Sequence, residues 1–441
     1  MTVLDQVRIT GSTASAIASS VEAAIRENAL APGRQLPTIR ALAAELGVSP
    51  MTVASAYREL RRRGLLTTAG RRGTRVSARP PLPVTTAPLV PVGARDLATG
   101  NPDPGLLPAA AAALADLDSR PRAQPESSKF DRLVELAEAQ FAADGIPAPT
   151  LAVVAGALDG VERVLAAQLA PGDTVAVEDP VFVRVLDLLR ALDLIPVPVP
   201  VDDAGLRPDE LEAALAGGAR ALVVTPRWQN PFGACLTKER TDEVRRVLDR
   251  HEDVLVVEDD HAGLIAAERA FSVAAGRPRW ATVRSVSKAF GADFRLALMT
   301  GDRTTLARVE GRQLLATGWV SHILQELVAH LWTDLAVRAG LEQTASIYAA
   351  RRLLLLNALA VRGIAAHGAS GLNVWIPVVE EATTVAAMLQ RGWAVIAGER
   401  WRLNTGPAIR ITTSTLRAEE TEALADDLAE VLAQRPGAYS A

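Results

Sequence analysis

The chain has 441 residues, 49% of them hydrophobic, and a net charge of −4 at neutral pH. This length is enough for two or three domains with separate hydrophobic cores. No apolar run reaches the roughly 18 to 20 residues of a membrane-spanning helix, the first residues lack the pattern of a signal peptide, and the single cysteine excludes an internal disulfide. These features argue against a membrane protein or a disulfide-stabilised secreted protein and predict a cytoplasmic one.

The charge is divided unevenly along the chain. Residues 1–79 contain 12 arginines and 5 acidic residues, a net charge of +7, whereas the remaining residues carry a net charge of −11. A basic N-terminal part on an acidic remainder predicts that only the N-terminal part meets a polyanion.

The first 79 residues are predicted to form a small helical domain. Apolar residues at helical spacing indicate a first helix around residues 17–25. A second helix is expected over residues 38–46, because Thr38 is typical of a helix N-cap and Gly47 of a helix end.

A third helix and a hairpin complete this domain. The helix is expected to begin at Ser49 or Pro50 and to end at Arg63. Two short strands are expected over residues 65–76, around the turn Gly-Arg-Arg-Gly at 70–73.

Residues 80–94 are predicted to be a linker. Five prolines and no charge occur between residues 80 and 91. Such a segment cannot hold a helix and is expected to extend as a semi-rigid spacer.

From residue 95 onward, apolar strand-like runs alternate with helical stretches. This alternation predicts an α/β domain with a mainly parallel sheet. We expect it over residues 95–435, with a large part at about 95–305 and a smaller α+β part at about 335–435. The predicted strands are residues 151–154, 174–177, 221–225, 254–258, 281–284 and 296–300.

Lys288 is the first candidate for a reactive residue. Only three of the 47 basic residues are lysines, and lysine, unlike arginine, can lose its proton and form a Schiff base with an aldehyde. Lys288 follows a predicted strand in the sequence Ser-Val-Ser-Lys, and Arg295 comes seven residues later. An amine flanked by hydroxyls and an anion-binding arginine suggests pyridoxal phosphate as cofactor.

The N-terminal domain resembles the winged helix-turn-helix of GntR-type bacterial regulators. The resemblance rests on QLPTIRALAAELGVS at 35–49, TVASAYREL at 52–60 and GLL at 64–66. In such a module the third helix enters the major groove of DNA, and the wing reaches phosphates or the minor groove. The resemblance implies DNA contacts from Arg40, Ser49, Met51, Thr52 and Tyr57, and from Arg71 and Arg72 on the wing.

The remainder resembles the fold type I pyridoxal-phosphate-dependent aminotransferases. More narrowly, the whole chain resembles the MocR subfamily, in which an aminotransferase-like α/β domain follows a GntR-type head. The family implies a domain-swapped homodimer with head-to-tail heads. The motifs are GAL at 156–158, EDPVF at 178–182, TPRWQNPFG at 225–233, VVEDDH at 256–261, SVSK at 285–288 and IRI at 409–411.

The resemblance implies a role for one or more residues of each motif. Backbone amides of Gly156, Ala157 and Leu158 would bind the cofactor phosphate, because the first N–H groups of a helix point at an anion. A carboxylate at Asp259 would keep the pyridine nitrogen protonated, which makes the ring an electron sink. The remaining assignments are Lys288 to the Schiff base, Ser285, Ser287 and Arg295 to the phosphate, Phe182 to the ring face, Asn230 to the phenolic oxygen and Arg410 to a ligand carboxylate.

Two tyrosines of the family pattern are missing. His261 stands where a tyrosine is expected two residues after Asp259, and the segment 125–130 lacks the family's Tyr-Gly motif. His261 would either hydrogen-bond the ring oxygen in a pH-dependent way or point away as a packed residue. These losses suggest a pocket retained for binding more than for efficient turnover.

The favoured function is a transcriptional regulator that responds to pyridoxal phosphate. The cofactor on Lys288 would be the effector or part of the effector site, with an amine or amino acid as a further ligand and operator DNA as the partner. The alternatives are an active aminotransferase with a fused DNA-binding head, or a regulator that senses another ligand in a degenerate pocket. No metal site is predicted, and residual aminotransferase half-reactions stay compatible with Lys288.

Overall fold

The computed structural model describes residues 9–26, 29–31, 33–62, 65–68, 73–77, 90–118, 120 and 127–433. The chain divides into two compact units, Met1–Ala87 and Pro88–Ala441, which we call the head and the body. Arg71, Arg72 and most of the predicted linker lie outside the described residues. Within the described ranges, no helix is long and apolar enough to cross a membrane.

The head contains the three helices and the hairpin strands that the sequence predicts. Thr38 accepts a hydrogen bond from the Ala41 amide, and Gly47 ends the second helix in the left-handed conformation with φ of 67°. Buried apolar side chains from all three helices, among them Ile17, Leu42 and Leu60, form a separate core. The elements are α1 (Ala14–Arg26), α2 (Ile39–Leu46), α3 (Pro50–Arg62) and the antiparallel pair β1 (Leu66–Thr68) and β2 (Thr74–Val76).

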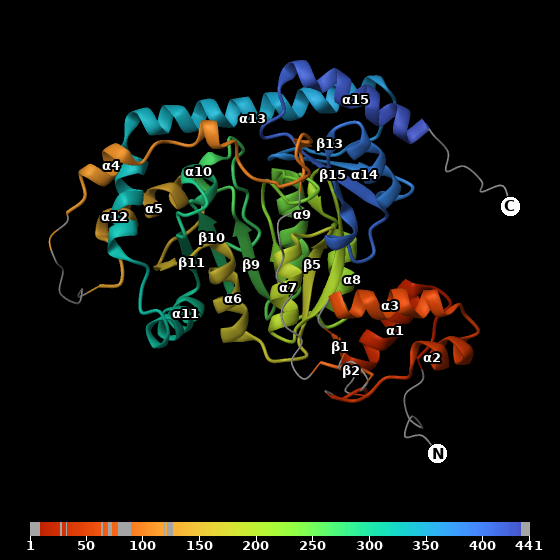
Figure 1. Ribbon diagram of the computed structural model, residues 1–441. Coiled ribbons are helices and arrows are strands. Elements are labelled where there is room, and N and C mark those ends of the chain that lie inside the picture. The colour runs from red at the N-terminus through yellow and green to blue at the C-terminus, as the bar shows by residue number, and fades with distance from the viewer. Residues whose placement is uncertain are drawn as a thin grey trace. The chain divides into compact units, whose positions relative to one another are not determined.

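The centre of the body is a mixed sheet of eight strands (Figure 1). All six predicted strands belong to it. The pairings between β10, β9, β8, β5 and β6 are parallel, whereas β11 runs against both of its neighbours and β7 runs against β6. Across the sheet the order is β4 (Leu151–Val154), β11 (Ala297–Gly301), β10 (Trp280–Ser285), β9 (Leu255–Asp260), β8 (Ala221–Val224), β5 (Thr174–Asp179), β6 (Ile195–Asp202) and β7 (Gly205–Leu206).

Strand β6 was not predicted, because its sequence IPVPVPVD carries three prolines. Prolines normally exclude a segment from the interior of a sheet. Here they occupy alternate positions, and the Ile195 amide donates to the Asp173 carbonyl at the end beside β5. The proline nitrogens therefore face the side where β7 pairs with only Val201 and Asp202.

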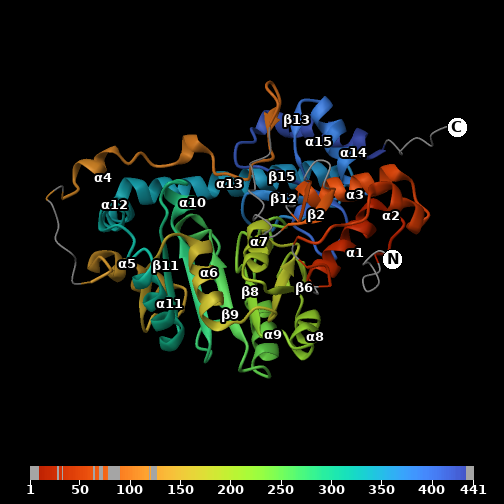
Figure 2. The ribbon, with the colours of Figure 1, turned by 60° about the horizontal axis from the view of Figure 1, so that its bottom comes forward.

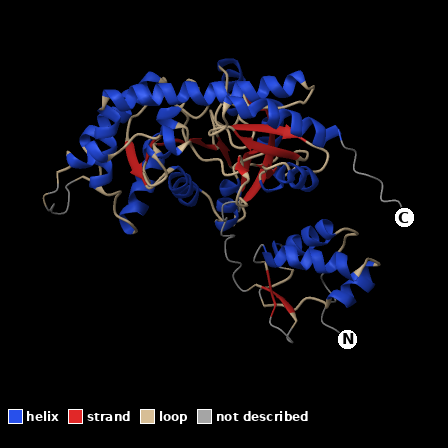
Figure 3. Ribbon diagram, turned by 45° about the horizontal axis from the view of Figure 1, so that its top comes forward, coloured by secondary structure: helices blue, strands red, loops and turns tan. Residues whose placement is uncertain are grey.

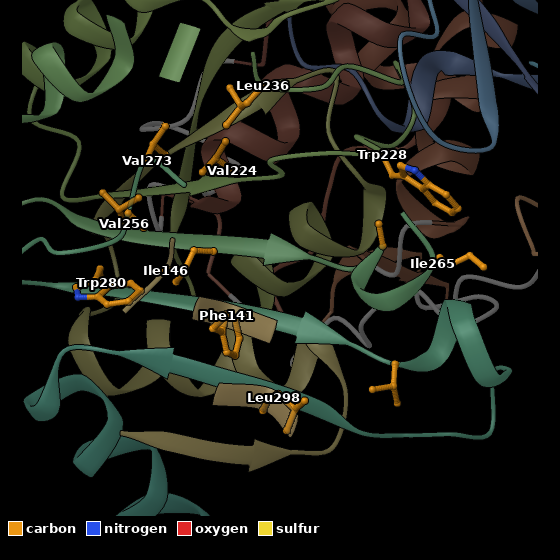
Figure 4. Packing of buried hydrophobic residues seen from close by; sticks show 14 of the residues in the cluster. Phe141, Ile146, Val224, Trp228, Leu236, Val256, Ile265, Val273, Trp280 and Leu298 are labelled. Carbon is orange, nitrogen blue, oxygen red and sulfur yellow. The ribbon is translucent and has the colours of Figure 1, made fainter. Parts of the chain in front are cut away.

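Helices cover both faces of the sheet, as Figures 2 and 3 show. Side chains along each strand point alternately to the two faces of the sheet and so belong to two different hydrophobic cores. On β9, Val256 packs in one core, whereas Leu255 and Val257 pack in the other. Figure 4 shows Val256 in the first core with Phe141 and Leu298. Helices α5 (Asp131–Ala143), α8 (Pro208–Ala216), α9 (Lys238–Leu248) and α12 (His322–Thr333) line the first core, and α6 (Ala157–Gln168), α7 (Val183–Ala191) and α11 (Arg303–Leu315) line the second.

A long helix, α13 (Leu335–Val361), leads from the large part of the body to a smaller α+β part (Figure 1). There a three-stranded sheet has the order β12 (Asn373–Pro377), β15 (Ala408–Thr412) and β14 (Ile396–Ala397), and β13 (Trp393–Ala394) pairs with β3 (Arg95–Asp96). The other elements are α4 (Ala111–Ala115), α10 (Ser287–Phe290), α14 (Glu381–Gln390), α15 (Ala418–Ala433) and the short helices η2 (Pro104–Leu106), η3 (Gly263–Ile265) and η4 (Gly398–Arg400).

Candidate cofactor site and candidate DNA-binding surface

Strand β9 ends with three buried acidic residues that have different environments. Glu258 accepts hydrogen bonds from two hydroxyls and two backbone amides. Asp260 accepts from Arg227 at 2.9 Å through both carboxylate oxygens and from Arg284 at 2.7 Å. Although burial raises the pKa of Asp260, the two guanidinium groups hold it well below its ordinary value. The negative charge of Asp260 is thus neutralised by two arginines.

Asp259 is not compensated. Its side chain is buried, and Oδ1 has no hydrogen-bond partner among the described residues. Burial, and then the charge of Asp260, raise the pKa of Asp259 to about 7. A buried carboxyl group without a partner is costly, and it is suited to a ligand that brings a proton or a positive charge. A protonated pyridine nitrogen meets that requirement.

Lys288 lies on α10, directly after β10. Its Nζ donates a hydrogen bond to the Gly100 carbonyl at 3.3 Å. Burial, and then the charge of Arg410, lower the pKa of Lys288 to about 8. Since only the neutral amine attacks an aldehyde, the environment favours the reactive form more than an exposed lysine would.

His261 follows the β9 acids and lies in the electrostatic field of Lys288. Burial, and then the Lys288 charge, lower the pKa of His261 to about 4. The ring also hydrogen-bonds the backbone of Trp228. A titration of His261 near neutrality was expected from the sequence, but the structure places it in the acidic range, so the imidazole is neutral at pH 7.

The residues assigned to the phosphate lie at the start of α6 and after α10. Gly156 has φ of 105°, and a Cβ there would lie 2.7 Å from a terminal nitrogen of Arg295. No side chain caps α6, and Arg295 is exposed without a carboxylate partner in the described part of the chain. Free amides at a helix start beside a cation fit a phosphate dianion.

The two serines near Lys288 already have partners within the protein. Ser285 Oγ accepts from the Ser287 amide at 3.2 Å, and Ser287 Oγ donates to the Phe294 carbonyl at 2.7 Å. Phe182 directly precedes α7 and packs, half-buried, against apolar side chains. The structure leaves the expected contacts of these three residues with the cofactor as predictions.

Arg410 on β15 is a buried cation that forms no ion pair with a carboxylate among the described residues. One terminal nitrogen donates to Asn230 Oδ1 at 3.0 Å, and the guanidinium lies 4.7 Å from the centre of the Trp401 ring. Its Nε has no hydrogen-bond partner within the described residues, and burial lowers the pKa of Arg410 to about 10. Such a site suits a ligand carboxylate, which would supply the missing negative charge.

A backbone segment that was not predicted from the sequence contacts these groups. Gly100 accepts from Lys288, and the Ala98 carbonyl accepts from Arg410. The run Thr-Gly-Asn-Pro-Asp at 99–103 is rich in turn-forming residues. That composition was the available signal, but turn residues by themselves do not reveal which side chains they meet.

The candidate DNA-binding surface lies on α2 and α3 of the head. Arg40, Ser49 and Met51 are exposed, and Thr52 is half-buried. The Ser49 hydroxyl accepts from the Thr52 amide at 3.1 Å and thereby caps α3. Two further exposed residues on the Met51 face of α3, Ser55 and Arg58, were not predicted.

The expectation that Tyr57 faces DNA was wrong. Its side chain is 1% exposed and belongs to the core of the head. The hydroxyl donates to the Pro37 carbonyl at 3.0 Å, and burial, followed by the charge of Glu45, raises the pKa of Tyr57 well above its ordinary value. Tyr57 therefore anchors α3 to the start of α2.

Comparison with known proteins identifies relatives of both units. Residues 94–428 match the family model of aminotransferase class I and II, and residues 13–76 match that of the bacterial regulatory proteins of the gntR family. The chain is 38% identical over 431 residues to the vitamin B6 salvage pathway transcriptional repressor PtsJ of Salmonella typhimurium, which covers 96% of this chain and 99% of PtsJ. It is 31% identical over 245 residues to the pyridoxine biosynthesis transcriptional regulator PdxR of Corynebacterium glutamicum, or 52% of each chain.

Solved aminotransferases share the fold of the body. A tetra mutant of the aspartate aminotransferase of Thermus thermophilus superimposes with a TM-score of 0.67 at 23% identity, over 78% of this chain and 100% of that chain. The kynurenine aminotransferase of Pyrococcus horikoshii, in complex with PMP, gives a TM-score of 0.68 at 20% identity, over 76% and 90%. The predicted fold class, a winged helix-turn-helix head on a fold type I body, is confirmed.

We predict that Tyr57→Phe destabilises the head without weakening its contact with DNA. The change leaves the Pro37 carbonyl without its donor, which costs about 1 kcal/mol of unfolding free energy. Thermal unfolding of the full chain and titration with a labelled DNA fragment measure the two effects. A fall of more than about threefold in DNA affinity at unchanged stability would restore Tyr57 to the DNA-binding surface.

We predict that Asp259→Asn stabilises the cofactor-free protein at pH 8 and not at pH 4. Folding raises the pKa of Asp259 from about 3.9 to about 7, so the folded wild type loses stability as the pH rises through this interval. Each pKa unit is worth about 1.4 kcal/mol, which gives a gain of about 4 kcal/mol for the neutral amide. Urea unfolding of both proteins at the two pH values tests this, and an equal stability at pH 8 contradicts it.

Proposed function

Because the chain belongs to the class I and II aminotransferase family and carries a GntR-family head, the combination found in the MocR subfamily, we propose that it is a transcriptional regulator whose DNA binding responds to pyridoxal phosphate. One observation carries the proposal: the body of this DNA-binding chain keeps a buried carboxyl without a partner, Asp259, and a lysine with a lowered pKa, Lys288. The names of two relatives, PtsJ and PdxR, refer to vitamin B6 and pyridoxine.

The donors and acceptors of the site fit pyridoxal phosphate group by group. The bound cofactor supplies an aldehyde for covalent attachment and a ring that withdraws electrons. Asp259, as a carboxylate, accepts a hydrogen bond from the protonated ring nitrogen, and Lys288 provides the amine. We assign the phosphate to the amides of Gly156, Ala157 and Leu158 with Arg295, Ser285 and Ser287, and the ring to Asn230, Phe182 and neutral His261.

Arg410 provides the second half of the site. An amine ligand that also carries a carboxylate would neutralise this buried guanidinium while its amine approaches Lys288. Lys288 comes from the large part of the body and Arg410 from the small part. A ligand that contacts both residues therefore favours one arrangement of these two parts over another. The linker can transmit this change in arrangement to the head.

We propose that the protein acts in the bacterial cytoplasm as a domain-swapped homodimer bound to operator DNA. Three apolar side chains on α11 and α12, Leu314, Leu315 and Ile323, are 62%, 90% and 57% exposed in the single chain. Exposed apolar groups of this size support a contact with a second copy. Paired heads would add their affinities on DNA.

An active aminotransferase is the second candidate, because Lys288 and Asp259 both keep the shifted pKa values that such chemistry uses. Repeated turnover of an amino donor and a keto acceptor, followed by absorbance, would establish it. A single half-reaction that stops after one equivalent is compatible with the regulator.

We predict that Lys288→Arg abolishes the response to pyridoxal phosphate. The variant keeps the positive charge, but a guanidinium cannot bond to the aldehyde. The wild type is expected to develop a visible absorption band with the cofactor and to change its affinity for its DNA, and both effects are lost in the variant. The DNA is obtained by sequencing genomic fragments that the protein retains with and without the cofactor.

Lys238→Arg is the matched control, since Lys238 is an exposed lysine paired with Asp242 on α9. It is expected to keep both the band and the DNA response. A band that persists in Lys288→Arg would place the covalent attachment elsewhere, and a wild type without any band would exclude pyridoxal phosphate as the cofactor.

We predict that Arg410→Lys separates cofactor binding from ligand binding. A lysine cannot hold a carboxylate in two parallel hydrogen bonds, so the affinity for an amino acid, read from the spectral change of the bound cofactor, is expected to fall about 100-fold. The cofactor itself still binds through Asp259 and Lys288. An unchanged amino acid affinity would show that the carboxylate binds elsewhere.

A further inference from the structure

One buried carboxylate joins the large part of the body to the small part. Asp179 ends β5 in the large part and is 1% exposed. Its two oxygens accept hydrogen bonds from three consecutive backbone amides of the small part, those of Leu403 at 2.8 Å, Asn404 at 2.7 Å and Thr405 at 2.8 Å. The Thr405 hydroxyl also donates to the Asp179 carbonyl at 2.9 Å. The negative charge of Asp179 is therefore stabilised by backbone donors that belong to the other part.

The segment that Asp179 holds includes an aromatic side chain that packs against Arg410. Residues 401–405 connect η4 to β15. Trp401 begins this segment and is 4% exposed, and the centre of its ring lies 4.7 Å from the Arg410 guanidinium. The Trp401 carbonyl accepts a hydrogen bond at 2.8 Å from the amide of Val181, two residues after Asp179. Because a guanidinium stacks on an aromatic ring, the position of Trp401 constrains the direction in which Arg410 presents its N–H groups.

The end of β5 is thereby connected to both halves of the proposed site. Phe182, which we assign to the cofactor ring, follows Asp179 by three residues and packs in the same apolar cluster as Trp401. Arg410, which we assign to the ligand carboxylate, is reached through residues 401–405. Groups that bind a ligand bidentately must be held within about 0.5 Å of the required geometry by the residues behind them. Asp179 is placed to provide that support from the large part.

We propose that Asp179 is a positioning residue: it holds residues 401–405 and, through Trp401, orients Arg410 for the carboxylate of the amine ligand. This inference rests on the proposed function. Because the Asp179 carboxylate binds the amides of 401–405, its removal acts on the affinity for the ligand and leaves the covalent attachment to Lys288 unchanged. The large part thus sets the affinity of a carboxylate site that the small part carries.

Asp179→Asn in the full chain tests the proposal. The amide keeps one acceptor oxygen, places an NH2 group against a backbone donor and removes the negative charge. The probes are L-alanine, L-glutamate and L-lysine, which share the α-carboxylate and differ in side chain. Their affinities, read from the spectral change of bound pyridoxal phosphate, are expected to fall alike by about tenfold. The dissociation constant for pyridoxal phosphate itself is expected to stay unchanged.

Asp302→Asn is the matched control. Asp302 also accepts hydrogen bonds from backbone amides, those of Trp280 and Thr305 at 2.9 Å each, but both donors belong to the large part. Urea unfolding is expected to show a loss of stability in both variants, whereas the amino acid affinities of the control equal those of the wild type. A folded Asp179→Asn that binds the three amino acids as the control does overturns the proposal.

The double variant Asp179→Asn with Arg410→Lys shows whether Asp179 acts through Arg410. If it does, Asp179→Asn causes no further loss of amino acid affinity once Arg410 has been replaced, because the two changes remove the same interaction. Equal losses from Asp179→Asn in the wild type and in Arg410→Lys would show that Asp179 acts on the ligand by another route, and this result also overturns the proposal.

The indole N–H signal of Trp401 reports on the same contact without any ligand. In protein labelled with nitrogen-15 tryptophan, with Trp401→Phe to assign the signal, Asp179→Asn is expected to shift it and Asp302→Asn to leave it in place. An unshifted signal in Asp179→Asn contradicts the proposal. If the wild type forms no absorption band with pyridoxal phosphate, the proposed function fails; if the wild type binds cofactor and amino acids while the signal stays in place, only the role of Asp179 fails.

Discussion

The candidate cofactor site depends on three adjacent buried acidic side chains, of which two are stabilised by hydrogen bonds or by cations and the third is not. Glu258, Asp259 and Asp260 all end in the interior of the body, where an ionised carboxyl group is costly without partners. The fold supplies hydroxyls and amides to Glu258 and two arginines to Asp260. Asp259 receives neither, and the neighbouring anion makes its ionisation still less favourable. A protonated ring nitrogen would supply Asp259 with the hydrogen-bond donor and the positive charge that the protein gives to its neighbours.

Buried charged groups without counter-charges also explain how an aminotransferase fold can serve as a sensor. Lys288 and Arg410 are buried, the charge of Arg410 lowers the pKa of Lys288, and the two residues come from different parts of the body. Neither forms an ion pair with a carboxylate among the residues that the structure describes. The binding energy of an amine ligand whose carboxylate contacts Arg410 would therefore favour one arrangement of these two parts, and a regulator can use this without any turnover. His261, with its lowered pKa, is neutral where the family resemblance predicts a tyrosine, so the candidate site lacks a phenol at this position.

Much of this arrangement was predictable from the sequence, for reasons that differ between elements. The helices of the head have clear caps at Thr38 and Gly47, and the six predicted strands of the body are short apolar runs between helical stretches. Strand β6 was not predicted because it contains three prolines, which cannot donate to a neighbouring strand. They are tolerated because they occupy alternate positions and their nitrogens point away from β5, and this can be seen only when the neighbouring strands are known. The burial of Tyr57 and the contacts of Gly100 depend on packing between segments distant in the sequence. Local patterns contain no information about either.

The most direct test of the account is the ionisation of Asp259 itself. Carbon-13 NMR of the side-chain carboxyl groups, with Asp259→Asn to assign the signal, would follow its titration with and without pyridoxal phosphate. The account predicts a pKa near 7 in the cofactor-free protein and ionisation throughout the neutral range once the ring nitrogen shares its proton. A carboxyl group that titrates at an ordinary value of about 4 without cofactor, or one whose titration the cofactor leaves unchanged, would contradict it.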